Sequence, residues 1–226
     1  MYRYLVIAIC LCAPVHSAFA DLSWYLGAGG TYTTLETKDF SSGSGLGGSI
    51  PANDSISTGE FKDSPFGFQV YGGLNFSEYF GFALKYFDTG EAKDQWAGVY
   101  SVTVSPGLPP VTTDTDLTFD GDMSISGVTL YFVQTVPMSP KVDFALELGF
   151  TAQDLDFNWR DTSASGLIPA SSKIATDDTG FAIGALGRYK IVKNIAITGE
   201  LEWTTVDFGG LIDRPLRLSL NAEIHF

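Results

Sequence analysis

Beyond its first twenty residues this sequence has no cysteine, a single histidine and no long apolar run. Without cysteine the chain cannot form disulfides, use a thiol nucleophile or bind a metal through thiolates. A helix that crosses a bilayer needs roughly 20 consecutive apolar residues, and no segment after residue 20 reaches that length. The sequence therefore excludes a disulfide-stapled domain and a helical membrane protein.

Positive charge is also scarce: the sequence has 13 Lys and Arg but 26 Asp and Glu, so its net charge is −13. Nucleic-acid binding depends on clustered Lys and Arg, so we predict no nucleic-acid partner. What the chain does have is apolar and aromatic content, with 45% hydrophobic residues, 17 Phe and 10 Tyr. This is high for strands with one buried face and fits the aromatic girdles of a membrane barrel.

Residues 1–20 have the three parts of a secretory signal peptide. Arg3 supplies the positive start, residues 5–13 form an apolar run, and Ala18-Phe19-Ala20 is a small-x-small cleavage site. The run is too short to anchor the chain as a spanning helix. Cys10 and Cys12 both lie in this segment, outside the pattern of a lipoprotein processing site. We expect export, cleavage after residue 20 and one mature domain over residues 21–226.

Eight segments of the mature chain alternate apolar and polar residues, which is the pattern of strands with one face of each kind. The last is the cleanest: even positions from Leu216 to Phe226 are apolar and odd positions from Arg217 to His225 are polar. The segments cover approximately residues 22–36, 65–76, 80–86, 120–136, 142–150, 181–189, 195–203 and 216–226. In the fourth, Met123 and Ile125 have the opposite parity to the apolar residues after Gly127, so we expect a β-bulge there.

The connections between these segments alternate strictly between short and long. Residues 77–78, 137–141 and 192–194 are tight turns, whereas 37–64, 92–119 and 159–178 are long loops rich in Gly, Ser, Pro, Asp and Thr. Only residues 209–214 form a short connection on the second side. Outer-membrane barrels have short periplasmic turns and longer extracellular loops, and lipid tolerates no free sheet edge. The pattern predicts an all-β fold, an eight-stranded antiparallel up-and-down transmembrane β-barrel with both termini in the periplasm.

Two structural alternatives remain open. Residues 99–105 and 111–119 would make ten strands if they paired inside the membrane instead of extending above it. A soluble lipid-binding barrel would show similar alternation, although it would have no reason to collect its short turns at one end.

The chain resembles the OmpA-like outer-membrane β-barrel domain family, which includes Ail-like and Opa-like surface proteins. The resemblance rests on the segment Trp24-Tyr25-Leu26-Gly27-Ala28-Gly29 and on the hairpin over residues 67–90, which is similar to the family's second and third strands. Phe226 resembles the family's terminal sorting signal, which implies recognition by the barrel-insertion machinery. Because the chain ends at the last strand, we expect no periplasmic peptidoglycan-binding domain and no role in anchoring to the cell wall.

Folding the segments as a meander places charged side chains of both signs inside the barrel. We expect a lumen network with Asp143, Arg188 and Glu223 near the periplasmic end and the remaining charges near the middle. Eight strands leave an interior only just wide enough for side chains, and buried charges must be paired. We therefore predict a filled lumen and keep a narrow ion-selective pore as the alternative. The predicted network consists of Lys85, Asp143, Glu147, Arg188, Glu200, Glu202, Arg217 and Glu223.

Catalysis and metal binding find little support in the sequence. Known barrel enzymes of the outer membrane rely on a histidine near the outer leaflet, whereas His225 lies at the periplasmic end. Asp114, Asp116, Asp120 and Asp122, with Asp177 and Asp178, form an acidic cluster, but the spacing lacks the Gly and terminal Glu of a calcium loop. We predict no enzyme, cofactor or metal site, while divalent cations that bridge these loops to lipopolysaccharide stay an alternative.

The sequence points to a surface protein of the outer membrane. Six aromatic residues are expected to anchor the barrel at the membrane interfaces, as Trp and Tyr commonly do: Trp24, Tyr32, Tyr79, Tyr86, Tyr189 and Trp203. We predict a non-enzymatic protein with a structural or interaction role through its long extracellular loops, and a small porin-like channel as the alternative. Its expected partners are outer-membrane lipid, lipopolysaccharide, the insertion machinery and an unknown extracellular partner, and we expect a monomer.

Overall fold

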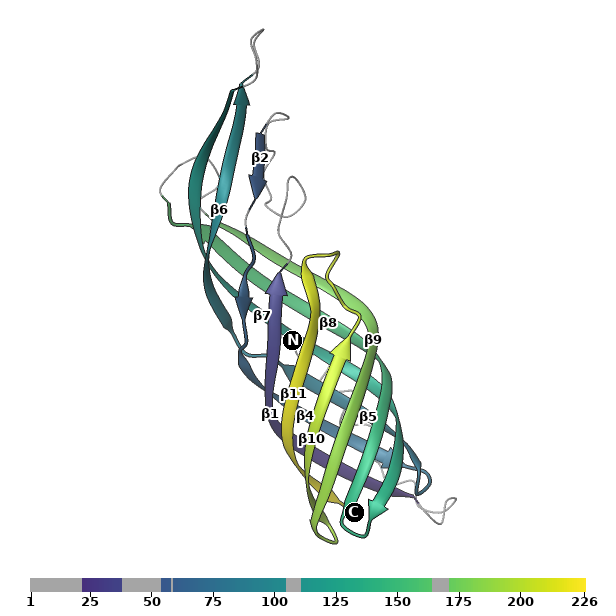
Figure 1. Cartoon of the computed structure of the whole chain (residues 1–226). Helices are drawn as coiled ribbons and strands as arrows, with labels where there is room; N and C mark the ends of the chain where they lie inside the picture. Colours follow the sequence, from purple (N-terminus) through teal and green to yellow (C-terminus); the bar gives the residue numbers. More distant parts are fainter. Residues whose placement is uncertain (1–21, 38–53, 58, 105–110, 164–170) are drawn as a thin grey trace.

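A computed structural model describes residues 22–37, 54–57, 59–104, 111–163 and 171–226, and every regular element in them is a β-strand (Figure 1). The expected signal segment, residues 1–20, lies outside the described residues. Within the described part, no helix is long and apolar enough to cross a membrane. In chain order the strands are β1 (Ser23–Thr37), β2 (Asp54–Ser57), β3 (Lys62–Asp63), β4 (Phe66–Asn75), β5 (Phe80–Asp88), β6 (Ala92–Val104), β7 (Val111–Ser139), β8 (Val142–Asp161), β9 (Ser171–Val192), β10 (Ile195–Thr204) and β11 (Ile212–His225).

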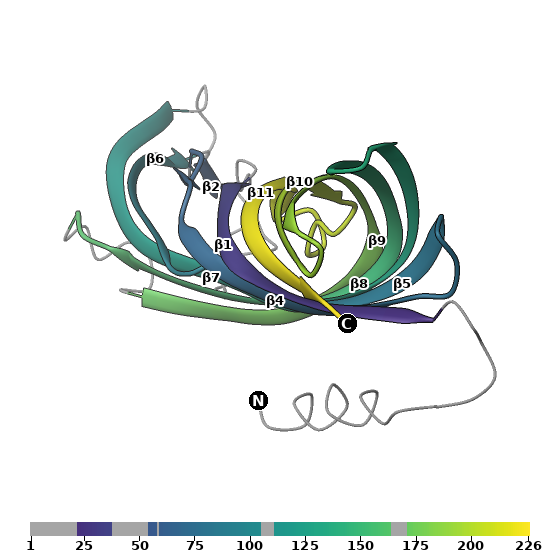
Figure 2. The same cartoon turned by 90° about the horizontal axis from the view of Figure 1, so that it is seen from below.

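Eight of these strands close into one antiparallel barrel. Their order around the wall is β1-β4-β5-β7-β8-β9-β10-β11, and β11 pairs with β1 to complete the ring. Closure runs through a long ladder in which Tyr25 lies opposite His225 and Tyr32 opposite Leu218. Seen from below, β1, β11, β10, β9 and β8 follow one another around the wall (Figure 2). The predicted eight-stranded up-and-down barrel is confirmed.

Each wall strand separates an outward apolar face from an inward face. On β11, Leu216, Leu218 and Leu220 are exposed, while Arg217 and Asn221 between and beside them are buried. Leu220 is 67% exposed and Phe150 on β8 is 66% exposed, values that would be costly in water for so many apolar side chains. Alternation of period two places lipid-facing and interior residues on the same strand. The alternating pattern in the sequence therefore describes the outside of the barrel correctly.

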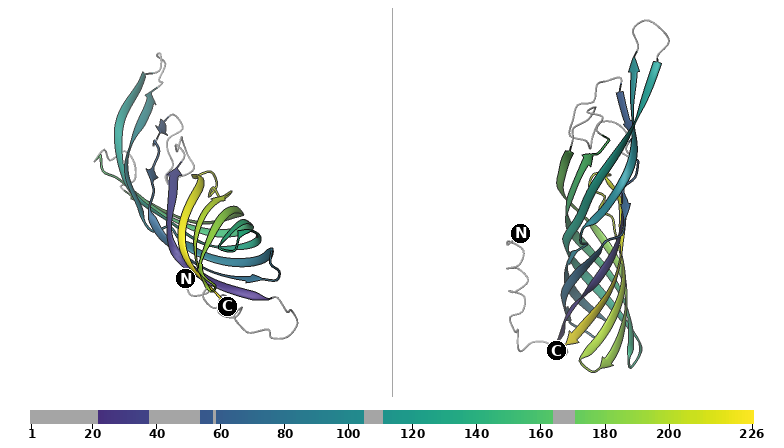
Figure 3. Two further views of the ribbon diagram at one scale, coloured as in Figure 1. Left: turned by 60° about the horizontal axis from the view of Figure 1, so that its bottom comes forward. Right: turned by 90° about the vertical axis from the view of Figure 1, so that its left-hand side faces the viewer.

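The strands on one side of the barrel are much longer than a membrane requires. A spanning strand needs about 9–11 residues, which β4 and β10 match with 10 residues each. By contrast β7 has 29 residues, β8 has 20 and β9 has 22. They continue beyond the lipid-facing band at the end opposite the tight turns, with the β6–β7 hairpin rising highest (Figure 3). Large parts of the expected loops at 92–119 and 159–178 are therefore strands, because neighbouring chain segments satisfy their backbone groups there.

The register of β7 corrects the expected bulge. Residues Ser126 to Gln134 pair with β5 and Phe119 to Pro137 pair with β8 without a register shift near Gly127. Met123 and Ile125 keep their inward parity and are fully buried. The predicted bulge is wrong because the interior of the barrel is apolar at this level, so apolar residues here face inward. Residues 99–104 pair with 111–116 above the barrel and add no strand to the ring, so the ten-strand alternative is wrong for the described residues.

Two neighbouring strands of the wall are interrupted at the same height. The last backbone pair between β4 and β5 joins Phe68 and Asp88. Gly90 follows with φ of 74°, a left-handed conformation that favours glycine. A Cβ at Gly90 would lie 2.2 Å from the carbonyl oxygen of Phe66. Glycine is required here because the two backbones approach too closely for a side chain.

Above this break, hydrogen bonds to two aspartate side chains replace the backbone hydrogen bonds of the ladder. Asp94 Oδ2 accepts a hydrogen bond from the Lys62 amide, and Asp63 Oδ2 accepts one from the Lys93 amide, both at 2.8 Å. The reciprocal bonds hold the segment before β4 against β6. Phe61 just before this segment is fully buried, and its amide donates to Thr37 Oγ1 at 2.9 Å.

Candidate functional site

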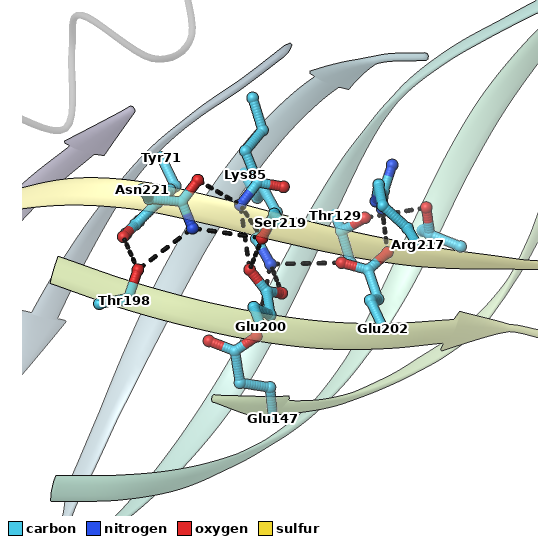
Figure 4. A network of polar contacts seen from close by, with 12 residues as sticks. Tyr71, Lys85, Thr129, Glu147, Thr198, Glu200, Glu202, Arg217, Ser219 and Asn221 are labelled. Carbon is cyan, nitrogen blue, oxygen red and sulfur yellow. Dashed lines mark hydrogen bonds and ion pairs between the residues drawn. The ribbon is translucent and has the colours of Figure 1, made fainter. Parts of the chain in front are cut away.

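The middle of the barrel is filled by an ionic network around Lys85 (Figure 4). The Lys85 ammonium bonds Glu200, lies 3.2 Å from Glu202 Oε2 and 3.4 Å from Glu147 Oε2, and is fully buried. The Arg217 guanidinium bonds Glu202, so one carboxylate links both cations. Lys85 also lies 4.5 Å from the centre of the Tyr131 ring. Pairing of this kind is what makes buried charge tolerable.

Neutral polar side chains complete this network. Gln69 Nε2 donates to Glu200 Oε2, Ser219 Oγ and Asn221 Oδ1, each at 3.0 Å. Asn221 Nδ2 in turn donates to Thr198 Oγ1 at 3.1 Å. These residues were not among the predicted lumen residues, although their inward parity on alternating strands was a usable signal. Gln69 adds a hydrogen-bond donor to the Glu200 carboxylate beside Lys85.

A second group of charges lies nearer the tight turns. Arg188 Nε donates to Glu223 Oε1 at 2.6 Å, and Arg188 Nη1 lies 3.9 Å from Asp143 Oδ2. Tyr71 Oη on β4 donates to Glu223 Oε2 at 3.1 Å and so reaches the same carboxylate across the intervening strand β1. The structure thus places all eight predicted lumen charges in the interior, in two contact groups, where five carboxylates face three cations.

Above the ionic network the interior becomes apolar. A cavity of about 10 Å³, at the lower limit of the room that one water needs, lies where the two regions meet and is lined by Thr33, Thr204, Phe87 and Arg217 among others. Beyond it lies an aromatic core in which Phe61 contacts Trp96 and Phe157, with ring centroids 5.5 Å and 5.7 Å apart. This upper core comprises Leu35, Phe61, Phe87, Ala92, Trp96, Tyr100, Leu117, Phe119, Met123, Ile125, Leu155, Phe157, Trp159, Val206, Phe208 and Ile212.

The upper core was not foreseen from the sequence. Its members come from five wall strands, from β6 and from two connections, and several lie in stretches expected to be loops. An alternation of aromatic and polar residues in 92–119 was the usable signal, with Trp96, Tyr100, Leu117 and Phe119 all of inward parity. Together the ionic network and the upper core occupy the described interior from one end to the other.

A family model described as the outer membrane protein β-barrel domain matches residues 5–226. The chain belongs to this family. Membership places the barrel in the outer membrane, with its tight turns in the periplasm and its long strands outside the cell. No curated protein sequence matches the chain.

Solved structures to which the chain is similar share little sequence with it. Neisserial surface protein A is 11% identical, with a TM-score of 0.52, over 90% of this chain and 97% of the other. Ail of Yersinia pestis is 17% identical, with a TM-score of 0.48, over 90% and 98%. The outer membrane protease OmpT of Escherichia coli is 10% identical, with a TM-score of 0.42, over 93% and 98%. At 11% identity, the similarity to Neisserial surface protein A speaks for the fold and not for the activity.

The six predicted interface aromatics all lie on outward positions near the ends of the lipid-facing band. Trp24, Tyr79 and Tyr189 lie at the periplasmic end and are 42%, 49% and 49% exposed. Tyr32, Tyr86 and Trp203 lie at the extracellular end of the band. Trp24 also stacks on the ring of Phe226 with centroids 3.9 Å apart, so the terminal aromatic packs on the first strand.

The remaining candidate residues do not converge on a reactive centre. His225 lies at the periplasmic end of β11, where its ring approaches the buried Glu223. Asp114, Asp116, Asp120 and Asp122 follow the outer face of β7 instead of surrounding a common point. In the described part of the chain, no three His, Asp or Glu side chains are placed to hold a metal ion.

Proposed function

We propose that this barrel is a non-enzymatic surface protein that acts through its extracellular sheet and does not conduct solutes. The observation that carries the proposal is the filled interior. Salt bridges occupy the membrane-spanning part, and the aromatic upper core lies between them and the outside of the cell. A continuous aqueous path would have to separate several of these buried ion pairs.

The extracellular sheet is the part that remains free to meet a partner. Strands β6 to β9 continue outside the membrane as paired backbone, which makes them a rigid platform rather than a set of mobile loops. Their outward side chains are mainly polar and acidic. Lipopolysaccharide surrounds the base of this platform, and an extracellular partner would bind above it.

Phe226 serves as the insertion signal in this proposal. Its amide donates to the Trp24 carbonyl at 2.9 Å and its ring remains 56% exposed at the periplasmic rim. The exposed ring of Phe226 at this rim is the feature that the insertion machinery would contact.

Planar-bilayer recording of the purified, folded protein tests the proposal. We expect no stable conductance above the bilayer background, because the lumen residues occupy the pore. The variant Phe61→Ala serves as a comparison, since it thins the upper core but leaves the ionic network in place, and it too should stay closed. A stable open channel in the unmodified protein would establish the porin-like alternative and overturn the proposal.

A further inference from the structure

Three lysines gather at one side of the periplasmic rim. Lys141 lies in the turn between β7 and β8, Lys190 near the end of β9, and Lys193 in the turn between β9 and β10. The Lys190 amide donates to the Lys141 carbonyl at 2.8 Å, so the two backbones lie side by side. Lys141 and Lys193 are exposed, and Lys190 is half-buried.

This concentration of positive charge contrasts with the rest of the molecule. At the extracellular end, the described cations each lie beside a carboxylate: Lys62 by Glu36, Lys93 by Glu91, Arg160 by Asp120 and Lys173 by Asp156, at 2.9–3.2 Å. At the periplasmic rim, Lys190 pairs with Asp143 at 2.7 Å. Among the described residues, Lys141 and Lys193 have no ion-pair partner. The rim therefore carries uncompensated positive charge on a strongly acidic protein.

The apolar neighbours of these lysines show where the rim lies relative to the lipid-facing band. Tyr189, Ile191, Val192 and Ile195 are each 43–54% exposed on the outer surface and mark the lower end of the lipid-facing band. Lysine stems lie along apolar surface while the ammonium group reaches the headgroup layer. Lys141 and Lys193 lie in turns at this edge with exposed side chains, so their ammonium groups can reach the phosphates of the inner leaflet. Lys190 has the inward parity of β9, and its ammonium group is paired with Asp143.

We propose that Lys141 and Lys193, beside the paired Lys190, form a docking site for anionic phospholipids of the inner leaflet of the outer membrane. Each Lys near an anionic surface contributes about 1 kcal/mol of attraction, which corresponds to roughly fivefold in binding. The site lies on one side of the rim, because the β4–β5 turn opposite carries Glu78 instead. It acts on the periplasmic leaflet and is independent of the extracellular role proposed above.

Lipid selectivity of the reconstituted barrel tests this site. The protein is folded into phosphatidylcholine vesicles, and spin-labelled phosphatidylglycerol is compared with spin-labelled phosphatidylcholine at the protein surface by electron spin resonance. We expect phosphatidylglycerol to be preferred over phosphatidylcholine by about fivefold, the contribution of one lysine, or by more. The variant Lys141→Gln/Lys190→Gln/Lys193→Gln should remove this preference, and about 1 M NaCl should suppress it, since the screening length falls to about 3 Å.

Two further variants separate the site from a general charge effect. Lys62→Gln/Lys93→Gln/Lys173→Gln removes the same number of charges at the extracellular end and should leave the preference unchanged. Lys141→Gln/Lys193→Gln keeps the Lys190–Asp143 pair, so it should fold normally while losing most of the preference. Heat-modifiable migration on a gel verifies folding in each case. A preference that persists in the periplasmic variants, or that falls equally in the extracellular one, would overturn the proposal.

Discussion

At the scale of single residues, Lys85 holds more of the interior together than any other side chain of the network. Three carboxylates from β8 and β10 face its ammonium group, and it is fully buried on β5. Arg217 cannot replace it, because Arg217 bonds Glu202 and packs on the Phe87 ring, 3.4 Å from its centre. The network therefore depends on one cation in a position that no neighbour can fill.

Replacing Lys85 by methionine should destabilise the folded barrel strongly. The substitution leaves Glu147, Glu200 and Glu202 with too little positive charge in a buried site, at a cost of about 3–5 kcal/mol. Urea unfolding of the protein in vesicles, followed by heat-modifiable gel migration, measures the loss.

The control for this prediction is Lys173→Met, which breaks an exposed pair with Asp156 and should change stability little. Adding Glu200→Gln to Lys85→Met should recover part of the loss, because it removes one of the stranded charges. An unchanged urea midpoint for Lys85→Met would contradict the assigned role.

At the scale of elements, the inward face of a single strand changes character along its length. On β7, Thr129 and Tyr131 face the ionic network, whereas Met123, Ile125 and Phe119 higher up face the aromatic upper core. The lower part lies inside the bilayer and needs polar partners for its charges. The upper part lies outside the bilayer, where an apolar interior is favourable in the same way as in a soluble sheet. One long strand thus serves two kinds of core.

Phe61→Ala should loosen the extracellular part without unfolding the barrel. Removing a fully buried Phe from between Trp96 and Phe157 costs about 3–5 kcal/mol of local packing. We expect faster protease cleavage between residues 54 and 64, and unchanged heat-modifiable migration of the membrane-spanning part. Phe66→Ala is the matched control, because Phe66 is 80% exposed to lipid and lies in the neighbouring strand segment. Equal cleavage in both variants would show that Phe61 does not hold this segment.

At the scale of the whole molecule, the barrel is a membrane anchor for an ordered extracellular sheet. In the ring, β5 pairs with the part of β7 that runs from Gln134 up to Ser126. Farther from the periplasm, β6 pairs with the part of β7 that runs from Met123 to Val111. The two parts therefore share strands β7, β8 and β9, whereas β6 pairs only in the outer part. Such a division lets the outer part vary while the inner part keeps its closure.

Shortening the β6–β7 hairpin should leave a folded barrel. Gly98 lies opposite Leu117, so residues 99–116 can be replaced by a two-residue Asn-Gly turn, which suits a hairpin of this kind. All pairs of the ring remain, and only β2 and the top of the upper core lose partners. We expect normal heat-modifiable migration and a modest fall in urea resistance. Failure to fold in vesicles would show that the outer sheet is required for barrel closure.

The location of apolar faces was predictable because a strand's side chains alternate with a period of two. Leu216, Leu218 and Leu220 could be assigned to one face without knowing their neighbours, and so could Lys85 and Glu147 to the other. The same rule failed at Met123 and Ile125, since it assumes that inward residues of a membrane barrel are polar. It also gave no information on which inward charges would meet, because contacts such as Gln69 with Glu200 cross the lumen between distant strands.

The sequence by itself determined the class of fold, the number of strands in the ring, which face meets lipid and which residues enter the lumen. These follow from local alternation and from the lengths of connections, which each segment carries alone. Only the tertiary structure decided that the strands continue outside the membrane, that aspartate side chains replace backbone pairs beside Gly90, and that an aromatic upper core lies above the ionic network. Those features depend on register and shear around a closed ring, which bring together residues far apart in the chain.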